Sequence, residues 1–262
     1  MNFTQPLHIL LPEFQSFLVV ASRTGGIVAA LPMLSGRTVP PQVKVALVLM
    51  LALALAPAIQ LPPIPPDAAA MTASLVSELS IGFVIGMSVR LLFSALEIAG
   101  EIAGTQMGFS MAQLLDPMTS VSAPMVGQFF TVIASLVFLS MNAHMMVVAA
   151  IVSSYESIPP FGASLSPAVG EEMLHLSQHM FLVAVKLAGP ILVAVAIINI
   201  LLAMLGRAVT QINVFVLSFS LTIAAGLVVL GLALPFMVSL FEREFIGLHE
   251  TIEGLLRALG HG

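Results

Sequence analysis

Residues 208–241 read AVTQINVFVLSFSLTIAAGLVVLGLALPFMVSLF, and they are the clearest indication of the fold class. It contains no Asp, Glu, Lys or Arg, and neither do residues 117–155 or 187–206. A helix that spans a membrane needs about 20 consecutive apolar residues, so each of these stretches is long enough. The sequence therefore predicts an all-α integral-membrane protein.

The composition of the whole chain agrees with this prediction. Of 262 residues, 59% are hydrophobic and only 8% are charged, and the mean hydropathy is +1.10. An average soluble domain is about 25% charged, so this chain could not cover a water-facing surface. A soluble enzyme is therefore disfavoured. The net charge of -5, without a basic patch, also argues against a nucleic-acid partner.

Outward from residues 208–241, the hydrophobic pattern predicts about six long apolar helices. Paired prolines such as Pro40-Pro41 and Pro159-Pro160 mark several of the breaks, because proline stops helices. The predicted segments are roughly 9–34, 43–61, 72–105, 123–153, 176–206 and 211–241.

The end of the chain differs in character from the rest. Apolar residues recur there at helical spacing between Glu250, Glu253 and Arg257. We expect residues 1–241 to form a membrane-embedded helical domain and residues 242–262 an amphipathic helix. That helix would lie on a membrane surface or against a partner.

The third segment contains small residues at regular spacing. Glycines let helix backbones approach closely, which is the usual way in which helices associate in lipid. Packing within the chain and packing against other subunits both fit this pattern. The predicted helix-packing positions are Gly82, Gly86, Gly100 and Gly104.

The same segment carries Glu78, Arg90, Glu97 and Glu101. Charges at bilayer depth are costly, and they usually face a cavity or a partner charge. Two interpretations stay open: a hydrated channel or proton path, or a helix that projects beyond the bilayer. His144, in the apolar fourth segment, is expected to make a packing hydrogen bond. We predict that Arg90, Glu97, Glu101 and His144 are buried.

Residues 105–125, TQMGFSMAQLLDPMTSVSAPM, are rich in Met and contain Gly and Pro. Non-helical backbone at membrane depth is tolerated only where it lines a cavity or is buried in protein. A plug or gate loop and an ordinary external loop are both compatible with this composition. The residues that would form a plug are Gly108, Phe109, Met111, Leu114, Asp116 and Pro117.

Catalytic and metal-binding patterns are weak. Glu171, His175 and His179 lie at four-residue spacing and could bind a metal, but one helix supplies too few ligands for a closed site. A solvated start of a helix is the better interpretation. No GxSxG, HExxH or GxxxxGK[ST] motif occurs. We expect neither a cofactor nor a structural metal.

A set of ordered motifs covers nearly the whole chain and is similar to one known family. The motifs are Arg23, Pro32, RTVPPQVKVAL at 37–47, Glu78, Gly82, Gly86, AGE at 99–101, Gly104, Gln106, Gly108, Asp116-Pro117, MNAH at 141–144, SIPP at 157–160, Pro190 and NVF at 213–215. With these motifs in this order, the chain resembles the FliR family of flagellar export-gate subunits, whose relatives serve virulence injectisomes. Thr210, Ser220 and Thr222 depart from the family pattern near its NVF element.

The resemblance implies a role in protein transport. FliR-like proteins join FliP-like and FliQ-like subunits in a hetero-oligomeric helical gate for unfolded secreted polypeptides. It also implies FlhB-like and FlhA-like export components as partners and the inner membrane at the flagellar basal body as location. The loop at about 106–123 corresponds to the family's pore plug, and the family has no enzymatic activity.

Two other classes of function are alternatives. A small-molecule secondary transporter of the inner membrane would predict inverted repeats and paired broken helices, which the sequence does not show. An intramembrane enzyme or metalloprotein would be built on Glu171, His175 and His179.

Overall fold

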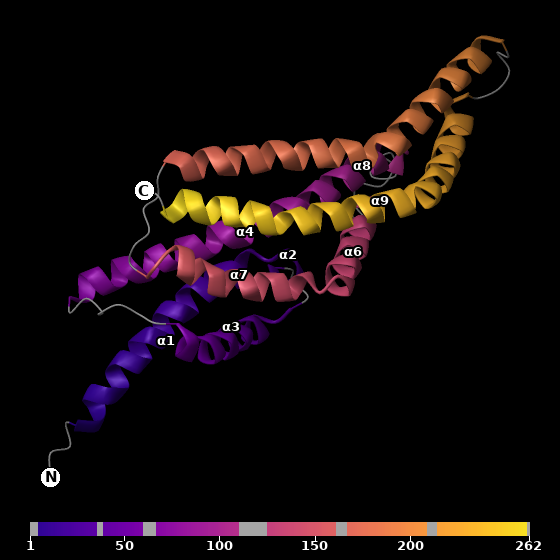
Figure 1. The fold of residues 1–262 in the computed structure, drawn as a ribbon. Coiled ribbons are helices and arrows are strands. Elements are labelled where there is room, and N and C mark those ends of the chain that lie inside the picture. Colours follow the sequence, from indigo (N-terminus) through magenta and orange to yellow (C-terminus); the bar gives the residue numbers. More distant parts are fainter. Residues whose placement is uncertain are drawn as a thin grey trace. The chain divides into compact units, whose positions relative to one another are not determined.

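A computed structural model describes residues 5–35, 39–59, 67–109, 125–160, 167–208 and 214–260, and these contain helices and no strands. Proline stands at or next to the first position of several helices, where its missing N–H costs nothing. The helices are α1 (Gln5–Ala30), α2 (Pro32–Ser35), α3 (Pro41–Leu55), η1 (Ala56–Ala58), α4 (Ala68–Gln106), α6 (Met125–Ser140), α7 (Ala143–Ser157), α8 (Pro167–Ala208) and α9 (Val214–Gly260) (Figure 1).

Four of the described helices are long and apolar enough to cross a membrane. They are Pro41–Ala58, Ala68–Gln106, Pro167–Ala208 and Leu217–Gly260, and the bent pair α6 and α7 makes a fifth if it counts as one span. The all-helical membrane fold is thus confirmed. Within α1, the stretch Phe14–Ala30 is a further, shorter apolar helix among the described residues.

The predicted helix at 123–153 is not continuous. The chain bends by 69° between α6 and α7, at Met141 and Asn142. Asn142 adopts a left-handed conformation with φ 55°, and its carbonyl accepts a hydrogen bond from the Met145 N–H at 2.9 Å. Asn is one of the few residues that adopt this conformation routinely, so one residue ends α6 and starts α7.

The left-handed backbone at position 142 should limit which residues are tolerated there. Asn142→Val should destabilise the protein by about 1–2 kcal/mol, because a β-branched residue strongly disfavours this conformation. Asn142→Gly should be close to neutral. Thermal unfolding of the two purified variants in detergent compares them directly. Equal stability would mean that position 142 does not need this backbone conformation.

The contacts of the chain divide it into two compact units. Unit 1 comprises Met1–Leu91, Asn142–Ser177 and Ile246–Gly262, and unit 2 comprises Leu92–Met141 and Gln178–Phe245. In unit 2, Phe93, Phe138 and Phe245 form a buried aromatic group with ring centroids 5.4 to 5.8 Å apart. Such edge-on and tilted rings pack favourably beyond the area that they bury.

Glycines set the close approaches between helices. In unit 1, a Cβ at Gly82 would collide with the Arg23 carbonyl on α1, and one at Gly86 would lie 2.7 Å from the Ile27 carbonyl oxygen. In unit 2, a Cβ at Gly100 would lie 2.6 Å from the Gly127 nitrogen on α6, whereas one at Gly104 would meet only the Val126 side chain, at 3.3 Å. At all four glycines, the neighbouring atoms belong to another helix of the same chain.

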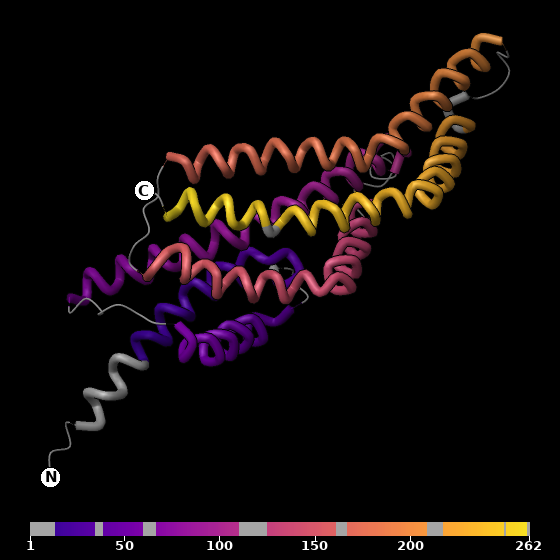
Figure 2. The backbone as a smooth tube through the Cα atoms, in the orientation of Figure 1, coloured from indigo at the N-terminus to yellow at the C-terminus, as the bar shows by residue number. Residues whose placement is uncertain are grey.

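The C-terminal segment is not a separate helix. α9 runs from Val214 to Gly260 without a break, as the yellow end of the tube shows (Figure 2). Its apolar face is buried within the chain itself, and a Cβ at Gly260 would lie 3.0 Å from the Ser157 carbonyl oxygen. Part of its surroundings is therefore supplied by α7 of the same chain, and contact of 242–262 with a membrane surface or a partner stays a prediction. The buried residues are Leu248, Ile252, Leu255, Leu256 and Leu259.

Candidate functional site

The most elaborate polar site lies inside unit 1, around the side chain of Arg23. Its Nε donates to Glu78 Oε2 at 2.6 Å, and its Nη1 donates to Ser154 Oγ at 3.1 Å. Its Nη2 donates to the Ile158 carbonyl at 3.2 Å, and its Cζ lies 3.8 Å from the centre of the Tyr155 ring. We call these five residues the Arg23 cluster. They link α1, α4 and the C-terminal end of α7.

The Arg23 cluster is almost completely removed from solvent. The side chains of Arg23 and Glu78 are 0% and 1% exposed. A buried charge is tolerated only when it is paired and its remaining hydrogen-bonding groups are satisfied, and each of the three guanidinium nitrogens has an acceptor here. A cation near the last carbonyls of a helix is also favourable, because the C-terminal end carries partial negative charge. The cluster therefore fixes three helices in one register.

The Arg23 cluster is absent from the site residues predicted from the sequence. A signal for it exists, because Arg23 and Glu78 are opposite charges in separate apolar segments. Intramembrane ionisable residues usually pair with one another. Only the fold shows that these two meet.

None of the four polar residues that the sequence predicts to be buried belongs to the Arg23 cluster. Arg90, Glu97, Glu101 and His144 are all exposed in the single chain, and their burial in an assembled complex stays a prediction. The buried sides of their helices carry apolar side chains such as Val89 and Leu96 instead. Each of these four side chains thus projects away from the core of its own chain.

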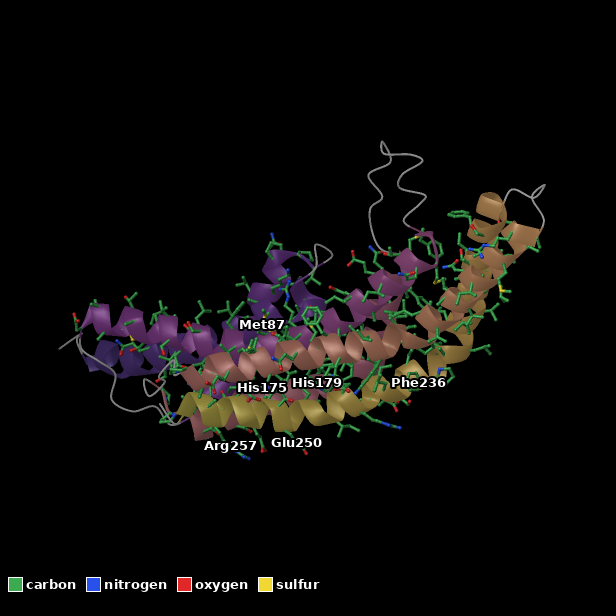
Figure 3. The ribbon with its side chains drawn as sticks, turned by 90° about the horizontal axis from the view of Figure 1, so that it is seen from above. Met87, His175, His179, Phe236, Glu250 and Arg257 are labelled. Carbon is green, nitrogen blue, oxygen red and sulfur yellow. The ribbon has the colours of Figure 1, made fainter. Side chains whose placement is uncertain are left out.

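The histidines of α8 also have a different arrangement from a metal site. Figure 3 shows His175 and His179 along α8, with Glu250 on α9. His179 Nε2 lies 2.6 Å from Glu244 Oε2 on α9, in unit 2. Among the described residues, no group of three or more His, Cys, Asp or Glu is arranged to hold a metal ion.

The base of the predicted plug loop is well defined in unit 2. α4 ends at Gln106, and Gly108 follows with φ 93°, a left-handed conformation that suits glycine at a helix end. Met107 is fully buried, and its carbonyl accepts a hydrogen bond from Thr222 Oγ1 at 3.4 Å. A Cβ at Gly226 would lie 2.7 Å from Met107 Cε.

These contacts attach the start of the loop to α9. The Phe219 ring lies beside Gly108, where a Cβ would come within 3.5 Å of it, and Phe109 is half-buried. The other predicted plug residues, Met111, Leu114, Asp116 and Pro117, lie outside the described residues. The start of the loop is thus held against α9, and the buried Met107 side chain is its main contact.

Comparison with known proteins identifies the family. Residues 14–248 match the family described as bacterial export proteins, family 1. The chain belongs to this family, the FliR family. The match extends from within α1 to within α9, so it includes the Arg23 cluster and the base of the loop. The family resemblance of the sequence motifs is thus confirmed.

Individual FliR-family members align with most of this chain. The chain is 27% identical to the flagellar biosynthetic protein FliR of Escherichia coli (strain K12), over 90% of this chain and 91% of the relative. It is 28% identical to the FliR of Bacillus subtilis (strain 168), over 97% and 99%. It is 30% identical to the FliR of Aquifex aeolicus (strain VF5), over 70% of each chain.

Proposed function

We propose that this chain is a subunit of a bacterial flagellar protein export gate in the cytoplasmic membrane. In this proposal it assembles with FliP-like and FliQ-like subunits around a path for unfolded polypeptides, next to FlhB-like and FlhA-like components. One observation carries the proposal: the family match covers residues 14–248, and relatives named flagellar biosynthetic protein FliR align over nearly their full length.

The structure is compatible with a structural rather than a catalytic role. The polar groups of the Arg23 cluster hold helices together, through an ion pair and two further hydrogen bonds. We propose that the chain performs no chemistry of its own, and that export draws its energy from an associated ATPase and the proton gradient.

We further propose that residues 106–123 restrain the pore when the gate is closed. The anchored base at Met107 and Gly108 supports this role, because a plug must be tethered at one end. The composition beyond it, rich in Met and Gly, suits a filling that adapts to an uneven lumen and then moves aside. A gate that is open about 1% of the time is held shut by only about 2.7 kcal/mol.

A leakage experiment tests the plug and, with it, the gate function. Met111→Asp, or deletion of part of 108–116, should make cells permeable to a small solute. The free energy that keeps the gate closed is small, so the loss of a few apolar contacts should increase the open population strongly. Gly170→Asp is the matched control, because Gly170 is exposed with nothing within 4 Å of an added Cβ.

Assembly of each variant is verified in parallel by co-purification. If the loop variants assemble normally and remain as impermeable as the parent, the plug assignment is wrong. Truncation within 242–262 does not serve as a control, because the apolar face of that segment belongs to the core of the chain.

A further inference from the structure

The two long helices α8 and α9 each contain an internal proline. Pro190 lies within α8 and Pro235 within α9, both in unit 2. Proline has no N–H, so the carbonyls of Lys186 and Gly231, four residues earlier, receive no helical hydrogen bond from it. Helices kink at such positions, and both helices change direction part-way along their length (Figure 1).

A glycine accompanies each proline. Gly189 directly precedes Pro190, and Gly231 is the residue whose carbonyl lacks the hydrogen bond from Pro235. Nothing in the described part of the chain lies within 4 Å of a Cβ added at either glycine, so no neighbouring helix holds the backbone there. Glycine and proline both weaken a helix, so α8 and α9 each contain a weak point.

The two weak points lie at the same level. Pro190 is 18 residues before Ala208, the end of α8, and Gly231 is 17 residues after Val214, the start of α9. At about 1.5 Å per residue, each distance is about 26 Å. Residues 191–208 and 214–231 can therefore turn together about one level. We call these two helical pieces the α8–α9 arm.

The rest of α8 and α9 in unit 2 is held more firmly than the arm. Phe245 of α9 packs against Phe93 and Phe138, with ring centroids 5.6 and 5.4 Å away. Leu187 of α8 is completely buried. In the arm, by contrast, large apolar side chains such as Met204 are more than half exposed in the single chain. The weak points thus separate a packed part from a sparsely packed part.

The arm carries the contact with the start of the 106–123 loop. Thr222 Oγ1 donates to the Met107 carbonyl at 3.4 Å, and it also lies 2.9 Å from the Ser218 carbonyl of its own helix. The hydroxyl therefore keeps an acceptor when the longer bond breaks. Because no donor is left unsatisfied, separating Thr222 from Met107 avoids the main penalty of losing a buried hydrogen bond.

The distance from the weak point makes this contact sensitive to a small rotation. Thr222 is 13 residues from Pro235, which is about 20 Å along the helix. A turn of about 15° at Pro235 would move Thr222 by about 5 Å, more than enough to separate it from Met107.

We infer that the α8–α9 arm turns about Pro190 and Pro235 and thereby releases Met107, the base of the 106–123 loop, when the gate opens. The inference rests on the proposed gate function and adds the part of the chain that moves. Two experiments test it, one on the motion itself and one on export.

The motion is measured with two nitroxide labels across Pro190. The chain has no cysteine, so Phe181→Cys and Met204→Cys label two exposed positions, about 35 Å apart along a straight helix. Pulsed electron spin resonance on the chain, purified with its accompanying subunits, gives the distribution of distances. The unsubstituted chain, treated alike, gives the background.

Pro190→Ala combined with Pro235→Ala should narrow this distribution about twofold, because both helices regain a backbone hydrogen bond. Pro167→Ala is the matched control, since Pro167 is the exposed first residue of α8, where no such bond is gained. Equal widths in the parent, the double variant and the control would overturn the hinge.

Export is measured with the base of the loop locked to the arm. A Cβ at Gly226 would lie 2.5 Å from Met107 Cγ, which is one bond from the Met107 Cβ, so the two Cβ atoms lie within about 4 Å, as a disulfide requires. Met107→Cys combined with Gly226→Cys should export at least tenfold less polypeptide when oxidised than when reduced. Met107→Cys alone should show no such difference.

Equal export by the oxidised and reduced double-cysteine chain, with the disulfide verified by mass spectrometry, would overturn the release of Met107. If the reduced chain does not support export, the width of the distance distribution decides. Failure of the proposed function has a different signature, because cells that lack the chain would then export as well as cells that contain it.

Discussion

Arg23→Met is expected to destabilise the protein by about 3–5 kcal/mol, the typical cost of breaking a buried ion pair by removing one partner. The substitution leaves Glu78, which is 1% exposed, without the guanidinium that neutralises it. The cost is large because the Glu78 carboxylate stays buried after it loses its Arg23 partner. Thermal unfolding of the purified variant in detergent measures the loss.

A double variant separates the ion pair from simple packing. Arg23→Met combined with Glu78→Leu removes both charges, and well-packed apolar replacements of buried pairs are often neutral. The double variant should therefore be more stable than Arg23→Met alone. Arg257→Met is the control, because its pair with Glu253 is exposed and should contribute little (Figure 3 shows Arg257 on α9). If the double variant is no better than the single one, charge compensation is not what holds this cluster.

Gly100→Leu is the second substitution with a large expected effect. A Cβ at Gly100 would already lie 2.6 Å from the Gly127 nitrogen and 2.8 Å from the Val126 carbonyl oxygen. These are backbone atoms of α6, which cannot rotate away as a side chain can. Overpacking a tight site costs about 1–3 kcal/mol, and occasionally more, so α4 and α6 must separate. Stability and co-purification with the other subunits should both fall.

Leucine substitutions at two other glycines serve as comparisons for Gly100→Leu. Gly104→Leu should be milder, because only the Val126 side chain stands nearby, at 3.3 Å. Gly231→Leu should be tolerated, since nothing lies within 4 Å of an added Cβ on that exposed residue of α9. Equal losses at positions 100, 104 and 231 would show that the close crossing of α4 and α6 is not the cause.

The helices themselves are predictable from the sequence. Runs without charge, such as 187–206 and 208–241, lie almost wholly inside α8 and α9, because a long apolar helix satisfies its own backbone. The end of α4 near Gly108 is also indicated, since glycine weakens a helix and readily adopts positive φ.

Other features depend on tertiary structure and cannot be predicted in this way. No Pro or Gly lies beside Asn142 to indicate a bend, and the run of residues without charge continues across it. The periodicity of residues 242–260 predicts an apolar face, but not that the same chain covers it. Likewise, Arg23 and Glu78 are 55 residues apart, so only packing of α1 on α4 brings them together.

Affinity purification of this chain at native abundance, followed by mass spectrometry of the intact complex, tests whether the chain works as one subunit of an export gate. We expect one defined hetero-oligomer in which FliP-like and FliQ-like subunits accompany the chain in fixed ratio. Gly100→Leu should reduce their recovery, whereas Gly231→Leu should not. A chain that purifies alone, or only with copies of itself, from membranes that contain those subunits would contradict the proposed function.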